Sequence, residues 1–201
     1  MSLFDSLART MNDLDRAGAS FAIVGGLAVG IRTEPRFTRD ADMAVSVAGD
    51  QEAEALVFGL VSSGYKAVAS LEQEVTGRLA TVRLVPPLSN DAGVIVDLLF
   101  ASCGIEPEIV AGSTRETIAL NVVGPVATVG HLIAMKILSE SDGRFQDRED
   151  LLALIRCCSA SDLETARAGM ALITARGFSR GKDLDAALEG FVALAAKHPS
   201  P

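Results

Sequence analysis

The chain is poor in aromatic residues and in cysteine. Its 201 residues include no tryptophan, one tyrosine and three cysteines, whereas 49% of them are hydrophobic. The core is therefore expected to be aliphatic, and the length suits one domain with an appendage or two small domains. An odd number of cysteines, with Cys157 and Cys158 adjacent, does not form a disulfide framework and indicates reduced thiols.

Zinc ligands and membrane segments are missing as well. Neither His131 nor His198 stands at a spacing from cysteine that is typical of zinc, and both are expected at the surface or at a helix cap. The N-terminus has no basic segment followed by an apolar stretch, and no apolar run is long enough to cross a bilayer. These features predict a cytoplasmic protein with no membrane partner.

Positive charge is scarce. The formal net charge is −8, which disfavours nonspecific nucleic-acid binding because such binding depends on Lys and Arg. One local group of cations, Arg32, Arg36 and Arg39, could still form a basic patch. The alternative is that these arginines lie in a solvated loop.

The first motif is a glycine pair at Gly25 and Gly26. The apolar run 21–24 before it predicts a buried strand, and the residues from Leu27 predict a helix. Such a strand, turn and helix start gather free backbone N–H groups that can bind phosphate. No Gly-Lys-Ser/Thr follows and the G-x-G-x-x-G spacing is absent, so neither a P-loop nor a Rossmann fingerprint is present. A tight turn that binds nothing is the alternative.

The second motif is a set of aspartates on predicted strands. Asp40 and Asp42 lie on one face of a strand, because side chains two residues apart point the same way, and Mg²⁺ is often held by such carboxylates. Asp97 is the single charge in the apolar run 93–100, where a lone buried charge is costly. If the two strands are neighbours, three carboxylates converge. The alternatives are solvated acids on an exposed strand edge and, for Asp97, an acceptor of backbone N–H bonds at a strand end.

The order of predicted elements indicates an α+β fold. We expect a mixed sheet flanked by helices in residues 1–125, and a helical C-terminal portion in residues 126–201. The predicted helices are 2–17, 50–63, 128–139, 147–157, 161–175 and 182–197, and the predicted strands are 21–24, 40–47, 65–69, 79–85, 94–100 and 116–123.

The helical portion contains charged residues on apolar faces. Lys136 lies in the apolar stripe of its predicted helix, either with its ammonium extended into water or reaching from a buried face towards a ligand. Asp147 lines up with apolar residues of the next helix. Its alternative role is the N-cap, with Asp150 in the first turn.

Together these residues resemble the nucleotidyltransferase superfamily, which has the polymerase-beta-like minimal fold. The matching positions are the segment Val24–Gly26, Asp40, Asp42 and Asp97, in this order. The resemblance covers roughly residues 20–158.

Within the superfamily the chain is most similar to the AbiEii-like branch, which contains the toxins of bacterial toxin–antitoxin systems. The positions that carry this are Thr38 before the acid pair, Lys136, and the charged helix start 147–150. Arg39 departs from the pattern, because a hydrophobic residue commonly precedes the first acid.

The resemblance implies an enzyme that transfers NMP from a nucleoside triphosphate to an acceptor hydroxyl with Mg²⁺. It implies Asp40, Asp42 and Asp97 as metal ligands, with Asp97 also as general base. Gly25, Gly26, Arg39 and Lys136 would hold the donor phosphates, and Lys136 would neutralise the leaving pyrophosphate. RNA and a small hydroxylated antibiotic remain open as acceptors, and an antitoxin protein is the implied partner of the toxin branch. A module on the same fold that binds a nucleotide or a partner without turnover is the alternative.

Overall fold

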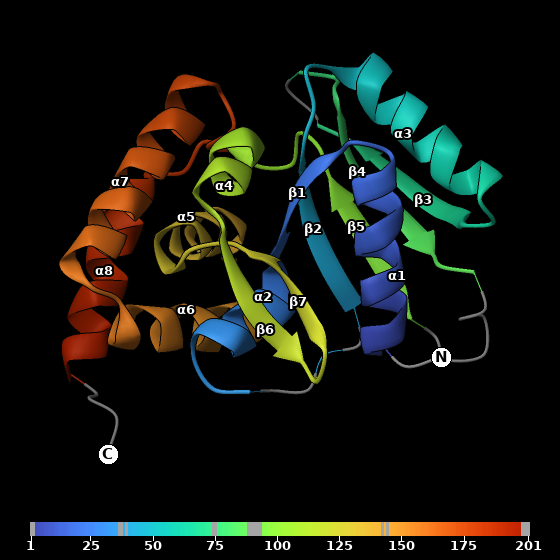
Figure 1. Cartoon of the computed structure of the whole chain (residues 1–201). Helices are drawn as coiled ribbons and strands as arrows, with labels where there is room; N and C mark the ends of the chain where they lie inside the picture. Colours follow the sequence, from blue (N-terminus) through green and yellow to red (C-terminus); the bar gives the residue numbers. More distant parts are fainter. Residues whose placement is uncertain are drawn as a thin grey trace.

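A computed structural model describes residues 3–35, 38, 40–73, 76–87, 94–141, 143 and 145–197. It shows a twisted sheet with helices α1 and α3 packed beside it, and a group of helices, α5 to α8, on its other side (Figure 1). The predicted α+β class and the mixed sheet flanked by helices are confirmed.

The sheet has seven strands in the order β3-β4-β5-β2-β1-β7-β6. Strand β2 runs parallel to β5, and β1 runs parallel to β7, while the other neighbours are antiparallel. The strands are β1 Ser20–Val24, β2 Asp40–Ser46, β3 Lys66–Glu72, β4 Leu79–Val85, β5 Ile95–Leu99, β6 Thr114–Ala119 and β7 Val122–Val126. The strands β1 and β5 lie inside the sheet between other strands, which explains why each contains a single polar residue, whereas the equally central β2 also carries two aspartates.

The helices follow the predicted positions closely. They are α1 Leu3–Arg16, α2 Gly25–Arg32, α3 Asp50–Ser62, α4 Glu106–Gly112, α5 Val129–Ser139, α6 Phe145–Cys157, α7 Ala160–Ala175 and α8 Leu184–Lys197. Side-chain caps fix where two of these helices begin. Ser159 and Asp162 form a capping box at α7, and the Thr128 side chain caps α5.

One prediction of local structure was wrong, and one helix was missed. Residues 116–123 do not form one strand, because the chain reverses between β6 and β7, where Asn121 has a φ of 63°. Asparagine tolerates this left-handed conformation and so permits a tight turn. Helix α4 was not predicted, because it is a short helix between two strands with no apolar periodicity of its own.

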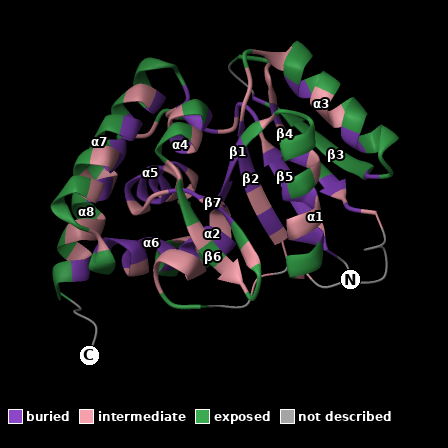
Figure 2. Cartoon of the chain, viewed as in Figure 1, coloured by how far each residue is buried: buried purple, intermediate pink, exposed green. Residues whose placement is uncertain are grey.

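One aliphatic core runs through the sheet and the helical group (Figure 2). Buried residues of the sheet, such as Leu98, belong to the same cluster as Ile133 of α5 and Met170 of α7. The last strand ends at Val126 and only helices follow it in the described chain. The division into units 1–125 and 126–201 stays a prediction. None of the described helices combines the length and apolar character that a membrane span requires.

Candidate active site

The site is built on two neighbouring parallel strands. Asp42 of β2 stands opposite Asp97 of β5, and Asp40 stands opposite Ile95. Side chains directly opposite each other in adjacent strands share a face, as do side chains two apart in one strand. The structure therefore brings Asp40, Asp42 and Asp97 together on one face of the sheet.

This proximity changes the acidity of Asp42. The pKa of its carboxyl is raised from 3.8 to about 6, first by burial and then by the negative charges of Asp97 and Asp40, which together outweigh the lowering effect of Lys136 and Arg83. A carboxyl with this pKa is ionised at neutral pH but at a free-energy cost. Such a cost is typical of functional sites, where a ligand or cation compensates it.

The glycine motif lies directly against Asp42. Gly25 has a φ of 63°, and a Cβ atom built on it would lie 1.9 Å from Asp42 Oδ2. Position 25 therefore requires glycine for its backbone conformation and for the close approach of the carboxylate. Helix α2 begins at Gly25 itself, so Gly25 and Gly26 form its first turn instead of a separate turn before Leu27.

Asp97 is paired with an arginine that sequence reasoning missed. Arg83 of β4 stands opposite Asp97 and donates from Nε to Oδ1 at 2.9 Å and from Nη2 to Oδ2 at 2.7 Å. This bidentate pair, and not a set of backbone amides, compensates the buried charge of Asp97. The signal was available, because Arg83 is the single charge in the strand Leu79–Val85, just as Asp97 is in its own.

Lys136 of α5 is held by two carboxylates. Its Nζ lies 2.6 Å from Asp147 Oδ1 and 2.7 Å from Asp150 Oδ2, and 12% of its side chain is exposed. Of the two alternatives for this lysine, the ammonium extended into water does not occur, and its role at the donor phosphates stays a prediction. Asp147 does not cap α6 but lies inside its first turn, where its carboxylate faces Lys136. Asp150 is buried, because its charge is balanced there.

The expected basic patch is only partly described. Arg32 does not lie in a solvated loop but in α2, where it binds Glu116 at 2.7 Å and the carbonyls of Val126 and Ala127. It therefore ties α2 to the β6–β7 hairpin. Arg36 and Arg39 lie outside the described residues, so the role of Arg39 at the phosphates stays a prediction.

The two histidines play no part in this site. His131 is 8% exposed, and its Nδ1 lies 2.9 Å from the hydroxyl of the cap residue Thr128. It is thus a buried histidine at a helix start and not a surface residue, and burial lowers its pKa. His198 lies outside the described residues.

The carboxylates fit a hard divalent cation. Among the described residues neither Asp40 nor Asp42 has a side-chain hydrogen-bond partner or ion pair, so their oxygens are available as ligands of the kind that Mg²⁺ prefers. In that same part of the chain no three His, Cys, Asp or Glu side chains are arranged as a preformed metal site. The pairing of Asp97 with Arg83 explains this, since both oxygens of Asp97 accept from the guanidinium.

A cavity of about 200 Å³ adjoins these residues. Gly25 and Asp42 line one side of it, and Lys136 of α5 lines the other. Arg180, from the loop between α7 and α8, completes its charged lining. Sequence reasoning missed Arg180, because nothing in the pattern relates an interhelical loop to the distant strands.

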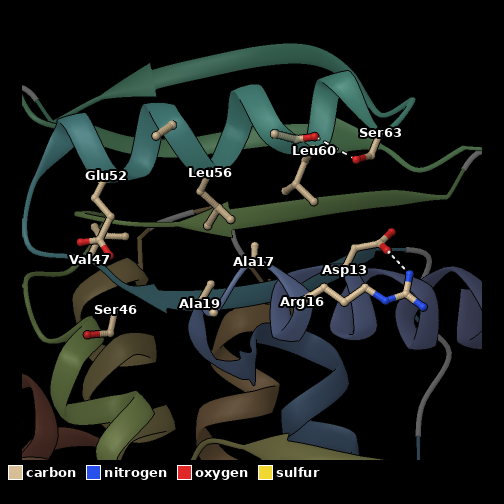
Figure 3. Close-up of a pocket in the computed structure, with 13 residues that line it drawn as sticks. Asp13, Arg16, Ala17, Ala19, Ser46, Val47, Glu52, Leu56, Leu60 and Ser63 are labelled. Carbon is tan, nitrogen blue, oxygen red and sulfur yellow. Dashed lines mark hydrogen bonds and ion pairs between the residues drawn. The ribbon is translucent and has the colours of Figure 1, made fainter.

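A larger hollow lies at the opposite end of β2, between α1 and α3 (Figure 3). Apolar side chains such as Leu56 and Leu60 point into it, and Asp13 and Arg16 pair with each other at its rim. It holds none of the site aspartates, because Asp40 and Asp42 stand at the other end of the strand.

We compared the sequence and the structure of the chain with those of known proteins. No protein-family model and no curated protein sequence matches the chain. Among solved structures, the antibiotic-resistance factor ANT(2'')-Ia is 16% identical, with a TM-score of 0.53 over 93% of this chain and 95% of that one. The chain has a nucleotidyltransferase-like fold.

Two further structures are similar at lower scores. An antigenic nucleotidyltransferase-like protein from Paracoccidioides brasiliensis is 20% identical, with a TM-score of 0.49 over 94% of this chain and 92% of that one. The lincosamide antibiotic adenylyltransferase LnuA, solved with lincomycin bound, is 14% identical, with a TM-score of 0.44 over 75% of this chain and 94% of that one.

Proposed function

We propose that the protein is a Mg²⁺-dependent nucleotidyltransferase that moves NMP from a nucleoside triphosphate to an acceptor hydroxyl. The observation that carries this proposal is the position of Asp40, Asp42 and Asp97 on one face of the sheet, with Asp42 directly against Gly25 at the start of a helix. An anion-binding turn beside a cluster of carboxylates suits a substrate that is a metal-bound polyphosphate. The fold supports the same conclusion.

The position of each residue suggests its role in the transfer. Asp40 and Asp42 would hold Mg²⁺, which when bound supplies positive charge to the reacting phosphate. The free N–H groups of Gly25 and Gly26 would bind donor phosphates. Asp97 would accept the proton of the acceptor hydroxyl as its oxygen bonds to the α-phosphorus and pyrophosphate leaves. Lys136 would contribute positive potential to the leaving group.

The acceptor is the less constrained part of the proposal. The excess of acid, with a net charge of −8, favours a small cationic hydroxyl compound, and ANT(2'')-Ia is itself an antibiotic-resistance factor. An RNA acceptor and an antitoxin partner would follow from the toxin branch that the sequence resembles. Of the basic residues expected to serve RNA, Arg32 is already committed to Glu116.

A second candidate is a module that binds nucleotide without turnover. It is favoured by the ion pairs at the site, because Arg83 binds both oxygens of Asp97 and two carboxylates bind Lys136. A transferase must exchange or share these partners during the reaction, whereas a binding module need not.

The decisive experiment is incubation with each of the four nucleoside triphosphates, labelled at the α-phosphate, with Mg²⁺ and either total RNA or a cationic hydroxylated antibiotic. We expect label on one acceptor class, and no transfer by Asp42→Asn. Asp15→Asn, which removes an equal charge from an exposed position of α1, should transfer normally. If the protein binds nucleotide with Mg²⁺ but transfers no label to either acceptor, the binding module is the better description.

A further inference from the structure

In the part of the chain that the structure describes, the cavity beside Asp42 is lined by one cation that forms no ion pair with a carboxylate. Its charged lining consists of Asp42, Lys136 and Arg180. The ammonium of Lys136 already faces two carboxylates at 2.6 and 2.7 Å. Two of its three N–H donors therefore bind carboxylates of the protein, and a bound anion would have to compete with Asp147 and Asp150 for its charge.

Arg180 differs from Lys136 in its partners. Its Nη2 donates to the carbonyl oxygen of Ser102 at 3.2 Å, and within the described chain no carboxylate pairs with it. A carbonyl accepts one hydrogen bond from the guanidinium but carries no formal charge. Most donors of Arg180 and its whole positive charge thus remain available at the rim of the cavity.

The loop that carries Arg180 is fixed on both sides of it. Phe178 is 6% exposed and packs against Gly104, where an added Cβ would lie 2.6 Å from the Phe178 ring. Lys182 binds the carbonyl oxygens of Leu138, at 2.8 Å, and of Glu140. Arg180 itself has a φ of 54°, a conformation that persists in a non-glycine residue only where the surroundings impose it. The loop therefore holds the arginine in place at the cavity.

We propose that Arg180 binds the phosphates of the nucleoside triphosphate donor. This inference rests on the proposed function and assigns a ligand contact to a residue outside the sheet. A guanidinium binds phosphate through two parallel hydrogen bonds, which an ammonium cannot do. The donor phosphates would lie between Arg180 on one side and the N-terminus of α2 at Gly25 on the other, both of which line the same cavity.

The test is calorimetric titration in Mg²⁺ with α,β-methylene analogues of the four triphosphates, which cannot transfer NMP, and with inorganic tripolyphosphate. We expect Arg180→Gln to weaken binding of the preferred analogue and of tripolyphosphate about tenfold or more, because a charge-assisted hydrogen bond is lost. Arg167→Gln should bind like the parent protein, since Arg167 is an exposed residue of α7 paired with Glu189 outside the cavity.

Two further variants separate binding from folding. Arg180→Gly removes the guanidinium and relieves the positive φ, so it should unfold at the same temperature as the parent or higher and still lose the affinity. Arg180→Lys keeps the charge without the bidentate geometry and should lie between the parent and Arg180→Gln. If the parent protein binds an analogue and Arg180→Gln binds it equally well, the assignment of Arg180 is wrong while the proposed function stands. If the parent protein binds none of the analogues, the assignment of Arg180 and the proposed function are both wrong.

Discussion

Replacing Asp42 by asparagine should stabilise the protein at neutral pH while removing the proposed transferase activity. The pKa of this carboxyl rises from 3.8 to about 6 in the folded protein. The folded state therefore favours the protonated form. Its contribution to stability is fully present below pH 3.8 and is lost as the pH rises through about 6.

The size of the effect follows from this shift. A rise from 3.8 to about 6, at about 1.4 kcal/mol for each pKa unit, corresponds to a cost of about 3 kcal/mol for ionising Asp42 in the folded protein. Asparagine has nearly the same shape and no charge, so Asp42→Asn avoids this cost. Its advantage over the parent should be near zero at pH 4 and grow to about 3 kcal/mol at pH 7.

The assay is the free energy of unfolding in urea, measured for both proteins from pH 4 to pH 8 with a chelator present. The difference between the two proteins isolates Asp42, because other titrating groups are common to both. Asp15→Asn serves as control and should differ from the parent by a constant amount. A difference that stays flat between pH 4 and pH 7, or that favours the parent at pH 7, would refute the electrostatic reasoning. Addition of Mg²⁺ at pH 7 should stabilise the parent and not Asp42→Asn.

Two further variants test the framework around the carboxylates by urea unfolding at pH 7. Gly25→Ala should lose about 1–2 kcal/mol or more, because alanine disfavours a positive φ and its Cβ would meet the Asp42 carboxylate. Gly59→Ala, with open space around its Cβ, should gain about 0.5–1 kcal/mol. Equal effects at the two positions would contradict the close approach of Asp42 to Gly25. Lys136→Met should lose about 3–5 kcal/mol because two carboxylates lose the ammonium that faces them. Arg167→Met, which breaks an exposed pair, should change little, and a similarly small loss for Lys136→Met would show that its pairing is not structural.

The sequence predicted the parts of the fold that depend on local pattern. Period-two alternation placed Asp40 and Asp42 on one face of a strand, and the structure has that strand at residues 40–46. Apolar runs located β1 and β5, and the helical half follows the predicted ranges within a few residues. These features depend only on neighbouring residues, which is why one sequence is enough to find them.

Features that depend on distant parts of the chain were missed. The three aspartates were predicted to converge only if β2 and β5 are neighbours, because no local pattern encodes which strands pair in the sheet. Arg83 reaches Asp97 only because β4 pairs with β5 in that register. Asp147 was interpreted as a cap because a carboxylate at a helix start usually is one, yet its partner Lys136 comes from the preceding helix.

The balance of charge at the site bears on whether Asp40 and Asp42 serve the structure or the binding of a ligand. Among the described cations of the site, Arg83 and Lys136 already pair with Asp97 and with the two acids of α6, and Arg180 forms no ion pair with a described carboxylate. Asp40 and Asp42 therefore remain in excess, and Asp42 carries the electrostatic cost in its raised pKa. A protein that needs this pair only for structure would gain stability by losing it, since an uncompensated buried charge contributes nothing favourable. The excess is reasonable when a cation arrives with the substrate, because the free energy released by pairing then drives binding of the metal-bound triphosphate.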